Sequence, residues 1–254
     1  MPNQNLQIIK QFAKTDFKLR YNGSVLGYAW SLLKPLMIFT ILNFVFSNIF
    51  GRTDPLYSLK LITSLIIWNF FSEGTMTGLT SIISKAGILT KIKLPKWTIV
   101  VASTTHICIT FCLNLIVLGG FYLFYGYYPS LIQIIALLFY AVCTYFLILG
   151  VSLVTSVLYV KYRDLNQIWE VLLMGAFYAS PIIYPMSAIP SYLHWVLHLN
   201  PMTFIIQYIQ ESMFNNFANF SIMANLIYLS VLTVGFVLAV YFFKRNSKKL
   251  VEQI

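Results

Sequence analysis

Charged residues are scarce in this chain, and the long stretches without any are more informative than the overall composition. Only 9% of the 254 residues are charged, while 59% are hydrophobic. No Lys, Arg, Asp or Glu occurs between Lys96 and Lys161, and Glu211 is the only one between Glu170 and Lys244. A soluble domain needs charged surface over such lengths, whereas a bilayer core about 30 Å thick requires roughly 20 apolar residues per helix. The sequence therefore predicts an integral membrane protein.

The sequence also lacks the motifs of several enzyme classes. It contains no G-x-x-x-x-G-K-[ST] phosphate-binding loop, no G-x-S-x-G and no H-E-x-x-H. We therefore expect no enzyme activity, no ATP site and no cofactor in this chain. His106 with Cys108 and Cys112 could be read as metal ligands, but a fourth ligand is missing, so packing with free thiols is favoured for all three cysteines, Cys143 included.

Six apolar runs are candidates for membrane spans. They are Leu32–Phe50, Leu59–Ile83, Ile99–Tyr125, Leu131–Val160, Ile168–Tyr184 and Ile222–Phe243. The pattern predicts an all-α integral membrane protein with six transmembrane helices. Residues 1–31 are polar and basic and do not resemble a secretory signal. We therefore divide the chain into a cytoplasmic element of residues 1–31 and a membrane domain of residues 32–254.

The positions of Lys and Arg between those runs predict the orientation. Fifteen of the 17 basic residues fall in the N-terminal stretch, the second and fourth loops and the C-terminal tail, leaving only Arg52 and Lys60 on the other side. Because cytoplasmic loops carry an excess of Lys and Arg, both termini are expected in the cytoplasm, with the chain in the cytoplasmic membrane. The net charge of +10 is explained by orientation and by attraction to anionic lipid, so nucleic acid is not expected as a partner.

Two predicted cytoplasmic segments contain more apolar side chains than a simple connecting loop would need. Residues 4–20 place apolar and basic side chains on opposite halves of a helical wheel, which predicts an amphipathic helix in the membrane interface, either a simple anchor or a contact for a partner. The loop of residues 84–97 interleaves lysines with Ile and Leu, so it could dock onto a protein or dip into the headgroups.

The longest external segment, residues 185–220, is expected to hold two short helices. Pro190 and Pro201 each favour a helix start, which gives Pro190–Leu199 and Pro201–Phe214. At 1.5 Å per residue the longer one measures about 21 Å, too short to cross a bilayer. Both are apolar, so we expect them to pack on the outer leaflet or to re-enter it between spans five and six.

Glu73 is the one acid near the middle of a predicted span. A carboxylate there costs about 2.5–3.5 kcal/mol on insertion scales, so it normally faces a partner or a water-filled path. The neighbouring Gly74 and Gly78 form a small-xxx-small pair that lets another helix approach closely. A helix-packing role is favoured over substrate contact.

One motif resembles a known family. The run DFKLRYNGSVLGYAWSLLKP, residues 16–35, closely resembles the start of the ABC type-2 permeases that export cell-surface polysaccharides, including O-antigen, teichoic-acid and rhamnose-polysaccharide transporters. The resemblance covers nearly the whole chain in family order, through Trp68–Phe71, Lys161–Asp164, Trp169–Glu170, Pro181–Tyr184 and Asn200–Pro201. Residues 16–35 and the run YASPIIY are most similar to the Gram-positive rhamnose-polysaccharide branch.

The resemblance implies a transport subunit that moves a lipid-linked polysaccharide, on an undecaprenyl-type carrier, outward across the membrane. Two copies would form the channel, and each would bind a separate ABC ATPase subunit that holds ATP and Mg. The implied ATPase contacts lie in residues 4–20 and 84–97, with Lys10, Lys14, Lys91 and Lys93 as candidates. The implied gate and motif residues are Arg20, Tyr21, Ser24, Gly27, Arg163 and Asp164. Asp164 is also a suitable N-cap for the fifth span.

The resemblance also implies a channel lined partly by aromatic residues. Aromatic faces suit sugars because they stack on apolar C–H faces without holding them tightly. The candidates are Trp30, Phe39, Phe46, Tyr178 and Tyr184. Two alternatives stay open: a permease of the same architecture for a drug or simple lipid, and a structural membrane protein without transport. The motif of residues 20–35 and the absence of a large external domain argue against the first. A neighbouring gene for a P-loop ATPase, among glycosyltransferase genes, would exclude the second.

Overall fold

The computed structural model describes residues 2–20, 25–51, 54–91, 94–218 and 220–247. These residues form helices and turns, with no strand among them, which confirms the all-α class. Five long helices are α2 (Trp30–Phe50), α3 (Tyr57–Ser84), α5 (Lys96–Phe124), α6 (Leu131–Lys161) and α10 (Ile222–Asn246). Shorter elements are α1 (Pro2–Arg20), η1 (Gly27–Ala29), α4 (Ala86–Leu89), α7 (Leu165–Tyr178), η2 (Met186–Ala188), η3 (Ser191–Leu193), α8 (His194–His198) and α9 (Pro201–Phe214).

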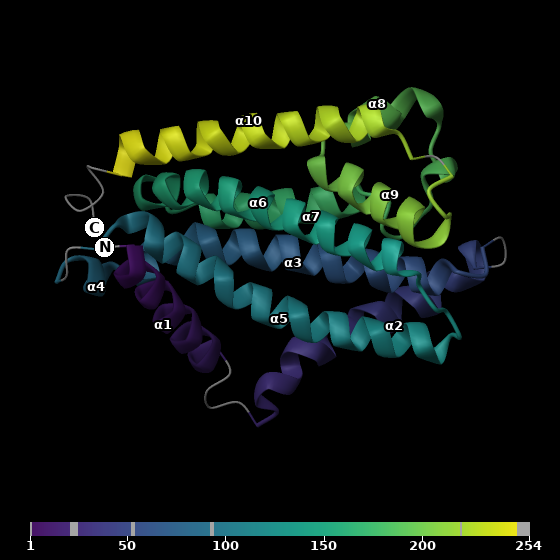
Figure 1. The fold of residues 1–254 in the computed structure, drawn as a ribbon, viewed down its shortest axis with the longest axis horizontal. Coiled ribbons are helices and arrows are strands. Elements are labelled where there is room, and N and C mark those ends of the chain that lie inside the picture. The colour runs from purple at the N-terminus through teal and green to yellow at the C-terminus, as the bar shows by residue number, and fades with distance from the viewer. Residues whose placement is uncertain (1, 21–24, 52–53, 92–93, 219, 248–254) are drawn as a thin grey trace.

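The long helices lie side by side in an elongated bundle (Figure 1). The beginning of α1 and the end of α10 lie at one end, together with α4, while α8 and α9 lie at the other. The predicted amphipathic helix of residues 4–20 is confirmed as α1, which packs against α5. The two ends of the bundle therefore differ in sequence character, since the end with α1 and α4 carries most of the basic residues.

Helix α3 occupies the centre of the bundle. It packs against α2, α5, α6, α7 and α9, and residues such as Leu61 and Ile67 are completely buried. The close approach of α6 depends on two glycines: a Cβ on Gly74 would lie 2.8 Å from the Ile148 side chain, and one on Gly78 would lie 1.9 Å from the Ser152 hydroxyl oxygen. The predicted role of this small-residue pair in helix packing is thus confirmed.

Three hydroxyl groups of α3 connect it to other helices. Each donates a hydrogen bond within α3: Thr63 to Leu59 (2.6 Å), Ser64 to Lys60 (2.8 Å) and Thr75 to Phe71 (3.0 Å), in every case to the backbone carbonyl four residues earlier. Their oxygens also accept hydrogen bonds from outside, at 2.9 Å from the Tyr122 hydroxyl, 2.8 Å from Gln210 Nε2 and 3.2 Å from Trp169 Nε1, respectively. These three buried or half-buried hydroxyl groups are therefore paired both within α3 and across to neighbouring helices.

In the part of the chain that the structure describes, four helices are long and apolar enough to cross a membrane: α2, α5, α6 and α10. They correspond to the first, third, fourth and sixth predicted runs. The second run is covered by α3, which is 28 residues long but is not among the four.

The length predicted for the fifth run, Ile168–Tyr184, is wrong, because α7 ends at Tyr178 and the chain then turns. Pro181 explains the early end. It has no N–H for a helical hydrogen bond and disfavours helical geometry in the residue before it.

The external segment follows the prediction with one difference. The predicted helix Pro201–Phe214 is confirmed as α9, with Pro201 in its first turn and the Asn200 side chain accepting a hydrogen bond from the Met202 amide at 3.0 Å. The other predicted helix, Pro190–Leu199, is divided into η3 and the short α8. The backbone carbonyl of Met213, near the end of α9, accepts hydrogen bonds from Tyr127 in the loop between α5 and α6 and from Gln133 in the first turn of α6, which anchors α9 to both.

Candidate functional site

The candidate channel aromatics of α2 lie in different environments. Trp30 begins the helix and is 44% exposed, so its ring faces outward from the chain. Phe39 is buried and packs edge-to-face on Phe121 of α5, with ring centroids 5.2 Å apart. Burial inside one chain favours a packing role for Phe39, and its place in a channel stays a prediction.

A chain of aromatic contacts joins the end of α2 to the turn after α7. Phe46 stacks on Phe50 with centroids 6.4 Å apart, and Phe50 lies 5.9 Å from Tyr57 at the start of α3. The Tyr57 hydroxyl donates a hydrogen bond to the carbonyl oxygen of Ile183 at 2.7 Å. Because Tyr184 follows directly, the structure brings Phe46 and Tyr184 into one region at the end of the bundle opposite α1.

Tyr178 and Tyr184 are also joined to each other. Tyr178 is the last residue of α7 and is 62% exposed. The Tyr184 hydroxyl donates a hydrogen bond to the backbone carbonyl of Tyr178 at 2.6 Å. Both rings therefore belong to one turn. Trp30 lies far from it, because the 21 residues of α2 separate its two ends by about 30 Å.

Side chains of α9 and the residue before it hold this turn in place. Asn200 donates to the Ser180 hydroxyl at 2.8 Å, and Gln210 donates to the Pro181 carbonyl at 3.1 Å. Gln210 also donates to Ser64 of α3. Sequence reasoning did not identify Gln210, and no local signal could have done so, because its partners lie 29 and 146 positions away.

The motif residues are only partly described. Tyr21, Ser24 and Lys93 lie outside the described residues, and Arg20 is described only through its backbone at the end of α1. Gly27 begins η1 with φ +48°, a left-handed conformation that favours glycine. Arg163 lies over the Tyr159 ring at 5.6 Å. Asp164 occupies the N-cap position of α7 as predicted, but its side chain makes no capping hydrogen bond.

Three of the four basic residues predicted to contact an ATPase are described, and they lie at the α1 end of the bundle. Lys10 and Lys14 are exposed on α1, and Lys91 is exposed just after α4. All three are available for an acidic or polar partner surface. Glu73, near the middle of α3, has its Oε1 atom 4.0 Å from Nζ of Lys34, the fifth residue of α2. An ion pair between neighbouring helices is consistent with the packing role expected for Glu73.

The structure adds a charged residue that the sequence did not single out. Lys85 follows the last residue of α3 and is only 8% exposed. Its ammonium group forms an ion pair with Asp16 of α1 and donates a hydrogen bond to the Ser103 hydroxyl of α5 at 2.8 Å. Lysine is rarely buried unless it is paired. This cluster therefore fixes α1 to the ends of two long helices.

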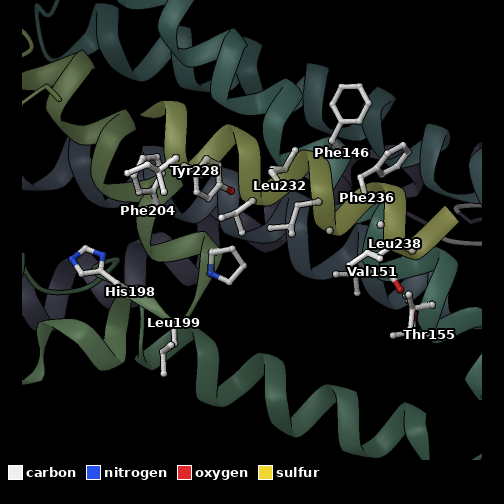
Figure 2. Close-up of a pocket in the computed structure, with 18 of the residues that line it drawn as sticks. Phe146, Val151, Thr155, His198, Leu199, Phe204, Tyr228, Leu232, Phe236 and Leu238 are labelled. Atoms are coloured by element: carbon white, nitrogen blue, oxygen red, sulfur yellow. Dashed lines mark hydrogen bonds between the residues drawn. The ribbon is translucent and has the colours of Figure 1, made fainter. Parts of the chain in front are cut away.

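A large apolar groove of about 1300 Å³ lies between α6, α9 and α10 (Figure 2). Phe204 and Tyr228 stack in it with centroids 4.2 Å apart, and Phe146 and Phe236 contribute a second aromatic pair at 5.5 Å. None of the predicted channel residues lines it. The groove is an apolar surface whose lining carries no Asp, Glu, Lys or Arg side chain.

Metal-ligating residues do not cluster in the part of the chain that the structure describes. No group of three or more His, Cys, Asp or Glu side chains there is placed to hold a metal ion. Cys108, Cys112 and Cys143 are free thiols, as expected. The predicted site residues that the structure describes gather mainly in two regions, which are the aromatic turn after α7 and the basic end at α1 and α4.

Comparison of the sequence with known proteins relates this chain to a family of transporters. A family model described as ABC-2 type transporter matches residues 7–214. The chain is 30% identical over 226 residues to the O-antigen export system permease protein RfbA of Klebsiella pneumoniae, which covers 89% of this chain and 85% of that protein. It is 27% identical to a protein of the same name from Myxococcus xanthus, over 77% of this chain and 75% of that protein. It is 23% identical to the polysialic acid transport protein KpsM of Escherichia coli, over 89% of each chain.

Proposed function

This chain belongs to the ABC-2 type transporter family, and on that premise we propose that it is the membrane-spanning subunit of an ATP-driven exporter of a lipid-linked cell-surface polysaccharide. The observation that carries the proposal is the similarity, over 89% of the chain, to a permease protein of an O-antigen export system. The polysialic acid transport protein matches over the same share of the chain. A polysaccharide is thus common to the names of all these relatives.

The chain is a multi-pass protein of the cytoplasmic membrane, since it belongs to this transporter family and four of the described helices are long and apolar enough to cross. We infer that α3 and α7 complete six spans. At 1.5 Å per residue the 28 residues of α3 measure about 42 Å, which exceeds the bilayer core. The 14 residues of α7 measure about 21 Å, so the turn from Ser180 to Tyr184 would lie within the outer leaflet.

The proposed orientation places α1, α4 and both termini in the cytoplasm. The excess of Lys and Arg at that end supports it through the positive-inside rule. Helices α8 and α9 would then lie on the external side, where α9 is too short to cross and is buried against α3 and α6. In this arrangement residues 1–31 are the cytoplasmic interface element and residues 32–254 are the transmembrane domain.

A second copy of the chain is part of the proposal. Helix α7 buries none of its residues within one chain, and α2 buries only Ser31 and Phe39. Apolar helices left uncovered in this way can be covered by a partner helix as well as by lipid. One densely packed bundle leaves no passage for a hydrated glycan, so we place the channel between two copies, with α2 and α7 at its edge.

The energy would come from a separate ATPase subunit that holds ATP and Mg, one for each copy. The absence of a phosphate-binding loop from the sequence supports this division of labour. Lys10, Lys14 and Lys91 are exposed at the proposed cytoplasmic end, and Lys93 is in the same loop by sequence. This chain would thus be a transport subunit and not itself an enzyme.

The proposed glycan path runs past the aromatic turn. Tyr178, Tyr184 and Phe46 share one region of the external end, and Trp30 would lie near the start of the path at the other end of α2. Exposed rings can stack on sugar faces while allowing them to slide. The lipid carrier, of the undecaprenyl type, would remain at the membrane while the glycan passes.

Depletion of this chain in its host tests the proposal. We expect surface polysaccharide to be lost and its lipid-linked form to accumulate inside the cell, and a hydrolysis-deficient ATPase partner should give the same result. If surface polysaccharide persists while export of a drug or simple lipid is lost, the permease serves that other substrate class. If neither is affected, the chain has a structural role.

A further inference from the structure

The buried Lys85 cluster joins three segments that are distant in sequence. Asp16 lies on α1, Lys85 lies between α3 and α4, and Ser103 lies on α5. The Lys85 ammonium forms its ion pair with Asp16 and hydrogen bonds to Ser103 at 2.8 Å, while the Ser103 hydroxyl lies 3.5 Å from Asp16 Oδ2. The Phe12 ring lies 5.4 Å from the same ammonium. One cation thus contacts a carboxylate, a hydroxyl and an aromatic face.

Because the ion pair is buried, each of its charges needs the other as a partner. The side chains of Lys85 and Asp16 are only 9% and 19% exposed, and Ser103 is 2% exposed. Removing one partner of a buried ion pair leaves an uncompensated charge, whereas replacing both partners by apolar groups is often tolerated. Such a pair is therefore better suited to fixing the position of α1 than to stabilising the fold as a whole.

The sequence offers no substitute for Asp16. It is the only acid before Asp54, so no other carboxylate of the N-terminal segment can take its place. Ala13, one turn earlier on α1, is also buried, at 4% exposure. Helix α1 is thus held in place through Asp16, the one carboxylate in residues 1–53 that can pair with Lys85.

The same cluster lies between the residues proposed to contact the ATPase. Lys10 and Lys14 are exposed on α1, which carries Asp16. Lys91 is exposed just beyond α4, which begins directly after Lys85. The ion pair consequently connects the two proposed ATPase-contact segments to each other and to α3, the central helix of the bundle.

We propose that the Asp16–Lys85 ion pair is the positioning element that makes α1, α4 and the adjoining ends of α3 and α5 move as one body. A force applied by the ATPase at α1 or at the loop after α4 then reaches α3. The inference rests on the proposed function, because it concerns how the energy of a bound ATPase is passed to the membrane helices.

The test compares export with ATP hydrolysis in the complete complex of this chain and its ATPase. Asp16→Asn and Lys85→Met should leave the ATPase bound and hydrolysing ATP, while the amount of polysaccharide exported per ATP falls about tenfold. The exchanged pair, Asp16→Lys with Lys85→Asp, should recover most of that loss, because the Ser103 hydroxyl can donate to a carboxylate or accept from an ammonium in either arrangement.

The ion pair between Asp54 and Lys60, at 2.6 Å, is a matched control at the other end of the bundle. Asp54→Asn should leave export per ATP unchanged. A thermal unfolding measurement on each variant identifies those that fail to fold. If a single variant does not fold, the apolar double variant Asp16→Leu with Lys85→Met replaces it, because exchanging both partners for apolar groups leaves no buried unpaired charge. In the same assay it should also export less polysaccharide per ATP.

The results separate this inference from the function on which it rests. If the unaltered complex exports no polysaccharide, or exports it without its ATPase, the proposed function fails. If the unaltered complex exports and the folded single variants keep normal export per ATP, the coupling role of Asp16 and Lys85 is overturned. The same conclusion follows if the exchanged pair exports no better than the single variants.

Discussion

Helices α3 and α7 were predicted alike, as membrane spans, yet they have opposite surroundings in the structure. Of the 28 residues of α3, 18 are buried, whereas α7 buries none of its 14. Neither is among the four helices that are long and apolar enough to cross on their own. The reasons differ. Helix α7 has too few residues, whereas α3 is long enough but its many Ser, Thr and Gly residues make it less apolar than the other four.

The difference shows how apolar helices divide their contacts between one chain and its surroundings. In α3, Gly74 and Gly78 admit α6 closely, so its apolar surface is used inside the bundle. In α7, only one side meets α3, where the Phe177 ring lies 5.7 Å from Trp68. The opposite side exposes apolar side chains, among them Val171, Leu172 and Met174. Its surface is therefore available to lipid or to a second copy.

The largest expected effect concerns the close contact of α3. Gly78→Ala should destabilise the protein by about 1–3 kcal/mol, because the new Cβ would lie 1.9 Å from the Ser152 hydroxyl oxygen. Thermal unfolding of the purified protein measures the loss. Adding Ser152→Gly should recover part of the loss by making room for the methyl group, less the cost of a glycine inside α6.

The matched change in α7 is Gly175→Ala, where nothing lies within 4 Å of a Cβ. Its expected effect is a gain of up to about 1 kcal/mol, because alanine is the better helix former. Equal destabilisation by Gly78→Ala and Gly175→Ala would remove the distinction between the two helices.

A smaller effect is expected on the association of two copies. Gly175→Leu adds a bulky side chain to the exposed side of α7 and should weaken the dimer by on the order of 1 kcal/mol, about fivefold in dissociation constant. Light scattering of the purified protein over a range of concentrations measures it. Gly120→Leu, at an open position on α5, is the control and should leave association unchanged. If both variants remain equally dimeric, α7 faces lipid.

The aromatic turn should respond in export and not in folding. Tyr178→Ala and Tyr184→Ala should each lower surface polysaccharide by up to about fivefold, on the order of 1 kcal/mol per lost stacking contact, with protein level and ATPase binding intact. Tyr184→Phe separates ring from hydroxyl, because it keeps the ring and loses only the bond to the Tyr178 carbonyl.

Phe124, an exposed aromatic residue at the end of α5, provides the comparison for these variants. Phe124→Ala should not change surface polysaccharide. Should it lower export as much as the tyrosine variants do, the aromatic turn has no special role in the path.

The smallest expected effect is at the start of α7. Asp164→Ala should change stability by less than about 0.5 kcal/mol, because Asp164 makes no capping hydrogen bond. Ser221, which accepts a hydrogen bond from the Ala224 amide at the start of α10, is the contrasting cap, and Ser221→Ala should cost about 1 kcal/mol. Thermal unfolding compares the two, and a larger loss at Asp164 would contradict the observed cap geometry.

Local signals in the sequence were enough for those parts of the fold that depend on neighbouring residues. Pro201 placed the start of α9, and the apolar and basic periodicity of residues 4–20 placed α1. The Gly74 and Gly78 spacing identified the close helix contact. In each case the physical cause lies within a few residues of the feature that it determines.

Contacts between distant segments could not be predicted in this way. Lys85 was counted only as one of several basic loop residues, because its partner Asp16 lies 69 positions away and nothing local indicates the pair. Gln210 was overlooked because nothing around it indicates that it reaches Ser64. The end of α7 was misplaced because the apolar run continues past Pro181, and composition outweighed the proline in that prediction.

The hydroxyl groups of α3 have a consequence for how the chain is assembled during synthesis. In the proposed six-span arrangement α3 crosses the membrane. Because Thr63, Ser64 and Thr75 donate to carbonyls of α3 itself, the nascent helix can then enter the bilayer before any partner exists. Their oxygen lone pairs remain to receive Tyr122, Trp169 and Gln210, which emerge from the ribosome later and in that order. Helix α3 thus serves as a template on which α5, α7 and α9 are added one after another.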